Sequence, residues 1–96
     1  MHTVVRNYSG KGAKDLASLL AKHKADVEAL LRPVKGFVSY TLAHTHEGCV
    51  SVTVCETKAG TDESLQKARD WIAKNAAETG ASAPTVTEGA VILHLK

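Results

Sequence analysis

The sequence predicts a small α+β domain in which strands and helices follow one another in the order βαββαβ. Four segments are rich in β-branched and aromatic residues, as strands are. Two other segments repeat apolar side chains every three or four residues, as amphipathic helices do. The chain has 96 residues, enough for one apolar core, so we expect residues 1–96 to form a single domain.

The first strand and the first helix are predicted in the first third of the chain. Residues 2–8, HTVVRNY, are typical of a strand, and the SGKG that follows is typical of a turn. From Ala13 onwards one largely apolar stripe predicts a helix that ends before Pro33 and Gly36. The stripe consists of Leu16, Leu19, Leu20, His23, Val27, Leu30 and Leu31.

A β-hairpin is predicted in the middle of the chain. Residues 36–45, GFVSYTLAHT, and residues 49–56, CVSVTVCE, are typical strands on either side of a short turn. A two-residue Glu47-Gly48 turn would place His46 opposite Cys49.

The second helix and the last strand complete the predicted fold. Gly60 and Thr61 open the helix, with Thr61 as its N-cap, and Gly80 lies just beyond its end. Its buried stripe is Leu65, Ala68, Ile72 and Ala76. Residues 85–95, TVTEGAVILHL, predict the last strand. This order is the ferredoxin-like arrangement, with two helices on one face of a four-stranded antiparallel sheet.

The hairpin register predicts which side chains share each face of the sheet. One face carries Val38, Tyr40, Leu42, His44 and His46 with Cys49, Ser51, Thr53 and Cys55. The other carries Phe37, Ser39, Thr41, Ala43, Val50, Val52 and Val54, and we expect helices to pack on these smaller groups. The face with Val38, Tyr40 and Leu42 would then lie opposite the helices, and we expect a homodimer to cover it. A one-residue change in turn length would exchange the two faces.

Composition narrows the set of partners and compartments. Twelve Lys and Arg against ten Asp and Glu give a net charge of +2 without a basic run, so we expect no nucleic-acid or membrane partner. No apolar run approaches the ~18 residues of a membrane span, and Arg6 stands where a signal peptide would be apolar. We therefore expect a cytoplasmic protein.

Four potential metal ligands, His44, His46, Cys49 and Cys55, lie within twelve residues. Along a strand the two cysteines would be about 20 Å apart, too far for a disulfide. Two imidazoles and a thiolate could supply three zinc ligands, but no fourth ligand follows at a telling spacing. We expect neither a metal site nor a disulfide, and interpret the histidines as the polar end of a sheet face.

Two apparent motifs are rejected. Residues 35–40, KGFVSY, match the start of an RNA-recognition signature, but they lie on the second strand instead of the third, and the third strand has no aromatic residue. The segment SGKGAKD lacks the spacing of a phosphate-binding loop.

Four residues are candidates for a substrate-binding pocket: Asn7, Tyr40, His44 and Trp71. The Asn7 amide, at the end of the first strand, suits a substrate carbonyl or dioxygen, although capping of the next turn explains it equally well. Trp71 flanks the stripe of the second helix, where core or interface packing is the alternative. Together these side chains could orient a polar aromatic molecule.

The pattern of the whole chain resembles the dimeric α+β barrel superfamily, and within it the antibiotic-biosynthesis-monooxygenase-like branch. The resemblance rests on the first strand ending in Asn7, on GFVSYTL before a hairpin, on the second helix with Trp71, and on the final EGAVILHL. It implies two ferredoxin-like sheets packed face to face, with a pocket in each subunit. The branch includes cofactor-independent oxygenases of polycyclic phenols and haem-degrading monooxygenases that use an Asn, a Trp and a His. Asn7 and Trp71 are comparable with the first two, but the histidine that directly follows the second helix in those enzymes has no counterpart here, where AAETGAS stands in its place.

Three functions remain open at this point. The resemblance favours an oxygenase that needs no metal or cofactor and acts on a small aromatic or enolisable molecule. A non-catalytic dimer that binds a small ligand is the alternative, followed by a haem- or metal-binding protein. We expect no cofactor.

Overall fold

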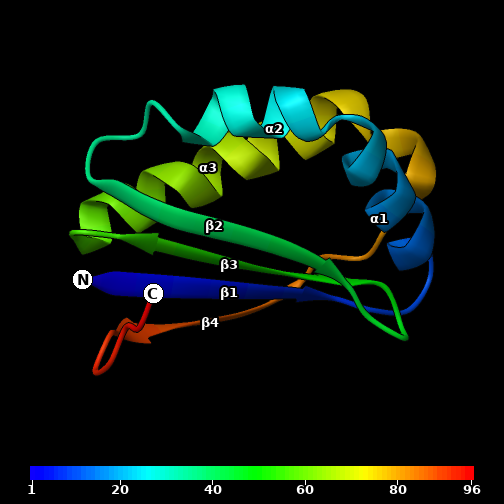
Figure 1. Ribbon diagram of the computed structural model, residues 1–96. Coiled ribbons are helices and arrows are strands. Elements are labelled where there is room, and N and C mark those ends of the chain that lie inside the picture. The colour runs from blue at the N-terminus through cyan, green and yellow to red at the C-terminus, as the bar shows by residue number, and fades with distance from the viewer.

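The computed structural model describes residues 1–96 and contains a four-stranded antiparallel sheet in the order β2-β3-β1-β4 (Figure 1). The strands are β1 (His2–Tyr8), β2 (Phe37–His44), β3 (Cys49–Cys55) and β4 (Thr85–Ala90). The first strand therefore lies inside the sheet, while β2 and β4 form its edges. The predicted ferredoxin-like α+β fold is confirmed.

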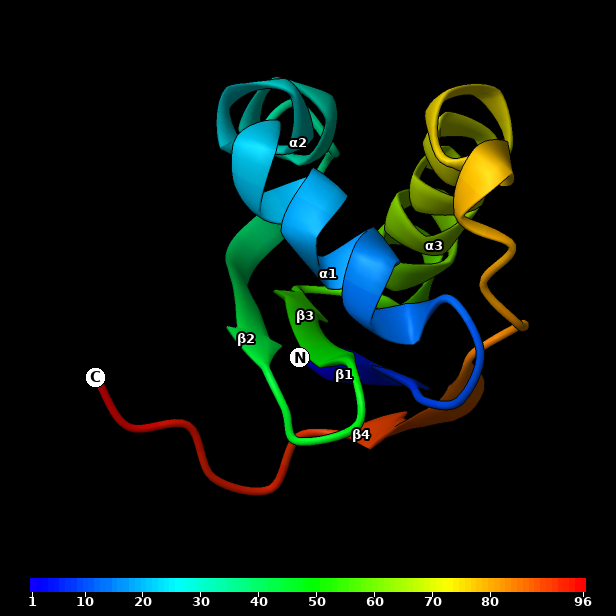
Figure 2. The ribbon, with the colours of Figure 1, turned by 90° about the vertical axis from the view of Figure 1, so that its right-hand side faces the viewer.

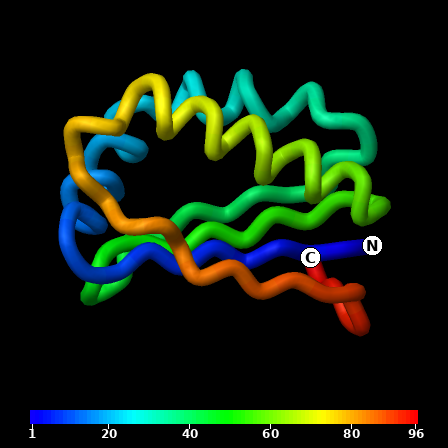
Figure 3. Tube along the Cα trace, turned by 180° about the vertical axis from the view of Figure 1, so that it is seen from behind, coloured from blue at the N-terminus to red at the C-terminus, as the bar shows by residue number.

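Three helices cover one face of this sheet, and the other face is free of helices (Figures 1 and 2). They are α1 (Ala13–Lys22), α2 (Lys24–Leu31) and α3 (Lys58–Asn75), and a short 3-10 turn, η1 (Ala77–Thr79), follows α3. The path from η1 to the edge strand β4 is visible from behind in Figure 3. No helix combines the length and the apolar character needed to cross a bilayer.

The predicted first helix is two helices separated at His23. The backbone of His23 leaves helical geometry, with φ −110° and ψ 34°, and its ring nitrogen Nδ1 lies 3.1 Å from a carboxylate oxygen of Asp26. The chain changes direction here, so that α1 lies over the sheet while α2 runs beside α3 (Figure 2). An apolar stripe does not reveal a break of a single residue, because side chains on both sides of it still face the core.

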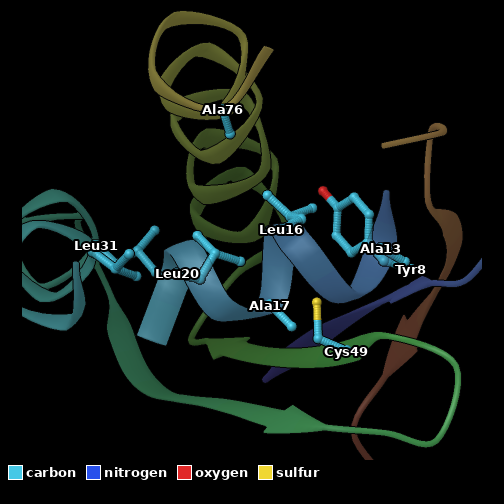
Figure 4. Close-up of a cluster of buried hydrophobic side chains, with 9 residues drawn as sticks. Tyr8, Ala13, Leu16, Ala17, Leu20, Leu31, Cys49 and Ala76 are labelled. Atoms are coloured by element: carbon cyan, nitrogen blue, oxygen red, sulfur yellow. The ribbon is translucent and has the colours of Figure 1, made fainter. Parts of the chain in front are cut away.

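The core lies between the helices and the sheet. Ala17 of α1 points down towards Cys49 on the sheet (Figure 4). Leu16 and Leu20 lie on the side of α1 that faces α3, and the Tyr8 ring stands beside Leu16. Leu31 of α2 and Ala76, which follows α3, complete the cluster from two sides. The amphipathic pattern of α1 thus accounts for its position over the middle of the sheet.

The prediction of which sheet face lies under the helices was wrong. Tyr40 and Leu42 pack against the core below the helices, and Cys49, Ser51 and Thr53 are buried on the same side. Residues directly opposite on neighbouring strands share a face, so the predicted grouping of β2 with β3 side chains is correct from Tyr40 to His44, while its orientation is reversed. The face without helices carries Val5, Val50, Val52 and Val54 with Thr41 and Ala43, and we call it the valine face.

The hairpin turn also differs from the prediction by one position. Thr45 and Gly48 exchange backbone hydrogen bonds across a two-residue His46-Glu47 turn, and His44, not His46, lies opposite Cys49. A β-bulge between Phe37 and Ser39 shifts the alternation at the start of β2. Phe37 therefore packs against the core, together with Tyr40.

Two further boundaries differ from the sequence prediction. Helix α3 begins at Lys58, so Thr61 is not its N-cap, and the Thr61 hydroxyl instead donates to the Lys58 carbonyl at 2.9 Å. The last strand ends at Ala90, and the tail after it lies on the side of the sheet away from the helices (Figure 2). Its large apolar side chains are exposed: Ile92 by 100%, Leu93 by 74% and Leu95 by 81%.

Candidate functional site

A cavity of about 520 Å³ lies between the helices α1 and α2 and the edge of the sheet formed by β2 and β3. This volume is within the range of small-molecule sites. Ten of its fourteen lining residues are apolar, so it suits a molecule with a large apolar part. The helices contribute Ala17, Leu20, Ala21, Lys24, Val27, Glu28 and Leu31, followed by Arg32, and the strands contribute Phe37, Tyr40, Leu42, Ala43, His44 and Cys49.

Strand β2 supplies the largest side chains of the cavity wall. Tyr40, Leu42 and His44 alternate along it and face the helices, whereas α1 contributes the small side chains of Ala17 and Ala21 opposite them. The two alanines leave space opposite these large side chains, and Leu20, Val27 and Leu31 close the rest of the helix wall.

The outer part of the cavity is polar. Lys24, Glu28 and Arg32 of the α2 region are exposed, and so is His44 on the strand side. Arg32 is paired with Glu28 at 2.7 Å, which leaves the Lys24 ammonium as an unpaired charge at this rim. A ligand would therefore meet a mixed polar rim before it reached the apolar interior.

A polar cluster lies deeper, on the strands behind the cavity wall. Arg6 of β1 is 4% exposed, and its Nη1 donates a hydrogen bond to the Tyr8 hydroxyl at 3.2 Å. Ser51 of β3 lies directly opposite Arg6 and is 2% exposed, and its hydroxyl oxygen has no hydrogen-bond partner. Buried polar atoms are rarely left without partners, so both residues require an explanation.

The electrostatics of this region are set by burial and by the Arg6 charge. Burial raises the pKa of Tyr40, and the positive charge of Arg6 partly opposes this, as does the neighbouring Ser51 hydroxyl. Burial likewise raises the pKa of the Cys49 thiol, against the same opposing charge. The Tyr8 pKa is raised by burial too, and Arg6 again lowers it. All three groups therefore stay protonated at neutral pH and can donate hydrogen bonds.

The structure brings two of the four predicted pocket residues together. Tyr40 and His44 both line the cavity. Asn7 is exposed, and because it pairs with Val50 it belongs to the valine face on the far side of the sheet. Trp71 of α3 is half-buried against the core, as its alternative interpretation expected, and its ring meets the His23 ring edge-on with 5.7 Å between centroids. Neither Asn7 nor Trp71 lines the cavity.

The four potential metal ligands are dispersed. His44 lines the cavity, while His46 lies in the turn beside Lys14 and Asp15. Cys49 and Cys55 are free and buried at opposite ends of β3. No group of three or more His, Cys, Asp or Glu side chains is placed to hold a metal ion.

Sequence reasoning missed Arg6 and Ser51. The alternation of β1 carried the signal for Arg6, because Val4, Arg6 and Tyr8 must share one face. A charged side chain between two buried ones is then buried with them, as the structure shows. For Ser51 the sequence carries no such signal, and only its pairing with Arg6 across the strands places it in the polar cluster.

Comparison with known proteins identifies the fold. The sequence matches no family model and no curated protein. Solved structures resemble it at low identity. SnoaB, a cofactor-independent oxygenase from Streptomyces nogalater, superposes with a TM-score of 0.67 at 18% identity, covering 98% of this chain and 95% of that one. A MhuD variant with two manganese protoporphyrin IX molecules bound per active site gives 0.66 at 18% identity, covering 99% and 97%.

A dimeric ferredoxin-like protein from an uncultured marine organism gives a TM-score of 0.66 at 11% identity, covering 99% of this chain and 95% of that one. Such identities relate folds and do not by themselves transfer an activity. The chain therefore shares the ferredoxin-like α+β fold of these solved structures over nearly its whole length.

Proposed function

We propose that this protein is a cofactor-independent monooxygenase that acts on a small aromatic or enolisable molecule bound in the cavity between α1, α2 and the β2–β3 edge. The observation that carries the proposal is the cavity itself, which is apolar inside and has Tyr40 and His44 on one wall. The likeness in fold to SnoaB, a cofactor-independent oxygenase, supports the same reading.

The proposed reaction uses electrons that the substrate itself supplies. A CH₂ group next to a carbonyl or between aromatic rings first loses a proton. The resulting carbanion or enolate transfers electrons to O₂ and forms a C–O bond. Loss of water then leaves a carbonyl group, so that CH₂ and O₂ become C=O and H₂O. The substrate carbon is oxidised and O₂ is the oxidant.

The residues of the cavity suit these steps. Apolar walls admit O₂ and keep water away from a reactive anion. His44 is the lining side chain best suited to accept the first proton, because histidine is the commonest general base in enzymes. Tyr40 remains protonated, because burial raises its pKa, and its hydroxyl can donate a hydrogen bond to a substrate oxygen.

Oxygen uptake is the direct test. Purified protein is mixed with a panel of polycyclic phenols and enolisable ketones in an oxygen electrode, and products are identified by mass spectrometry. We expect one oxygen atom of ¹⁸O₂ in the product. Ala21→Trp should abolish uptake by filling the cavity, whereas Ala29→Trp, on the exposed side of α2, should not. Ligand binding without uptake would favour the non-catalytic binding protein.

A porphyrin is the second candidate ligand, because MhuD shares the fold and its variant carries manganese protoporphyrin in the active site. His44 is the one histidine that lines the cavity, and Lys24 and Arg32 at the rim could pair with propionates. A bound haem would supply iron for oxygen chemistry. Titration with haem should then give a Soret band that is lost in His44→Ala and kept in His46→Ala.

We also propose a homodimer through the valine face. Val5, Val50 and Val52, which are half-buried in the single chain, give this face an apolar centre, and the exposed apolar tail after Ala90 lies on the same side of the sheet. An apolar sheet face of this kind is seldom left to solvent in a monomer. As expected from the sequence, the proposed dimer face is the one opposite the helices. Its residues are the valines instead of Val38, Tyr40 and Leu42. The dimeric ferredoxin-like neighbour supports the proposal.

A further inference from the structure

The buried charge of Arg6 has no counter-ion in the fold. Arg6 is absent from all six ion pairs of the structure, so no carboxylate lies within 4.0 Å of its guanidinium. Its hydrogen bond goes to the neutral hydroxyl of Tyr8, whose ring centroid is 5.9 Å from the guanidinium carbon. An arginine is charged at any physiological pH, and burying that charge without a partner costs free energy.

The second observation is independent of the charge. The Ser51 hydroxyl oxygen is buried and makes no hydrogen bond of good geometry, although the Tyr40 hydroxyl is its neighbour. Ser51 lies on the strand next to Arg6 and directly opposite it. Of all the buried side-chain oxygen and nitrogen atoms, it alone is unsatisfied. Two polar side chains with unused hydrogen-bonding capacity, both almost fully buried, thus lie side by side on the helix-covered face.

Their position connects them to the cavity. Leu42, Ser51 and Arg6 form one row across the strands β2, β3 and β1, because each lies opposite the next. Leu42 is part of the cavity wall. Neighbouring strands are about 4.8 Å apart, so Arg6 lies about 10 Å from Leu42 across the sheet. Arg6 and Ser51 are not lining residues and stand just behind the cavity wall. The Arg6 charge also acts on Tyr40 and Cys49, and both line that cavity.

We propose that the inner end of the cavity binds an ionised oxygen of the ligand, held by the Arg6 guanidinium and the Ser51 hydroxyl. The ligand class is an apolar, ring-sized molecule that carries a carboxylate, a phenolate or an enolate. The anion supplies the missing counter-charge of Arg6, and its lone pairs accept the hydroxyl proton of Ser51. Charge-assisted hydrogen bonds of this kind are the stronger ones in proteins.

This site deepens the proposed function and rests on it for the identity of the reacting group. In the oxygenase, Arg6 would favour the ionised form of a phenolic or enolic substrate, which is the form that gives electrons to O₂. The anion site itself requires only binding. A protein that binds the anion and consumes no oxygen would refute the proposed reaction and leave the anion site standing.

Calorimetric titration with matched probes tests the site at neutral pH. The probes are 2-naphthoate, which is an anion, and 2-naphthamide, which has the same ring system without the charge. A second pair, 4-nitrophenolate and 4-nitroanisole, tests a phenolate in place of a carboxylate. We expect each anion to bind about 10- to 100-fold more tightly than its neutral analogue.

Five variants locate the charge that causes this preference. Arg6→Met should remove the preference for the anion, Arg6→Lys should retain part of it, and Ser51→Ala should weaken it. Arg32→Met tests the cavity rim, and Arg69→Met is a control that removes an exposed arginine of α3 outside the cavity lining. Neither should change the preference. Circular dichroism of each variant verifies that it is folded.

The proposal fails if anion and neutral analogue bind equally to the unaltered protein. It fails equally if Arg32→Met abolishes the preference while Arg6→Met preserves it, because the anion would then lie at the rim. Absence of 2-naphthoate and 4-nitrophenolate binding at millimolar concentration would also refute it. If Arg6→Met is unfolded, the other variants decide. The assignment of the anion to Arg6 and Ser51 is then wrong if Ser51→Ala keeps the full preference for the anion and Arg69→Met loses it.

Discussion

Replacing Arg6 by methionine should stabilise the folded protein in the absence of ligand. Methionine has a similar length and no charge, and the site is 4% exposed. The effective cost of burying an ion is several kcal/mol, and that cost disappears with the charge. Against it stand the loss of the hydrogen bond to Tyr8, about 1.5 to 3 kcal/mol, and of the contact with its ring, about 0.5 to 1 kcal/mol. The balance is a gain of about 1 kcal/mol.

Urea unfolding followed by circular dichroism measures this difference. A gain of about 1 kcal/mol corresponds to a rise in melting temperature of about 4 to 8 °C for a domain of this size. Protein concentration must be the same for all variants, since a dimer makes the transition depend on it. Arg69→Met, at an exposed position, should change the free energy of unfolding by less than about 0.5 kcal/mol.

A companion variant separates the charge from its hydrogen bond. Tyr8→Phe removes the acceptor and leaves the charge buried, so it should destabilise the protein by about 1.5 to 3 kcal/mol. In the Arg6→Met background the same change should cost much less, and the double-mutant cycle gives the coupling. Destabilisation of more than about 2 kcal/mol by Arg6→Met alone would refute the reasoning. It would mean that the folded protein already neutralises Arg6.

Further expectations concern assembly, packing and pH. Val52→Asp, at the centre of the valine face, should convert the proposed dimer to a monomer of about half the mass in light scattering, because it would bury an unpaired carboxylate. Gln66→Asp, at an exposed position of α3, should leave the mass unchanged. A wild-type monomer at micromolar concentration would contradict the dimer. Gly60→Ala should lower the melting temperature, because the added methyl group would lie 2.8 Å from the Cys55 Cβ and 2.9 Å from the Lys35 carbonyl oxygen, and an unchanged melting temperature would disprove the contact. The free energy of unfolding should fall as pH rises through 9, because burial raises the pKa values of Cys49 and Cys55 above their usual 9.0. The unfolded chain therefore loses these protons first. Urea unfolding from pH 7 to 10 measures the fall, and its absence would mean that the thiols are solvated.

The order of the elements was predictable, while the orientation of the sheet was not. Alternation in β2 and β3 specifies which side chains share a face, and residues 40, 42, 49 and 51 do share one. Sequence alone does not say which face the helices cover, because both faces contain apolar groups. The small side chains of Thr41, Ala43 and the valines were interpreted as a packing surface for helices. The helices instead lie on the larger side chains, with a cavity between them.

The candidate site was predictable only in part, for a related reason. Tyr40 and His44 share a strand face, so they lie on the same side of the sheet whichever side the helices cover. The chemistry of Asn7 and Trp71 suits a pocket, but no strand register ties either residue to the face of Tyr40 and His44. Arg6, next to Asn7 in sequence, has the opposite orientation in β1 and is the buried member of the two. Successive side chains in a strand point to opposite faces of the sheet, so an error of one position moves a residue to the wrong face.

The order β2-β3-β1-β4 places the shape of the cavity and the buried charge on different strands. The side chains that shape the cavity wall, Tyr40, Leu42 and His44, belong to an edge strand, whose outer flank has no neighbouring strand. Arg6 belongs to an inner strand, hydrogen-bonded on both sides. Substitutions in β2 should therefore change the size and shape of the cavity, while the strands on both sides of β1 hold the Arg6 charge in place.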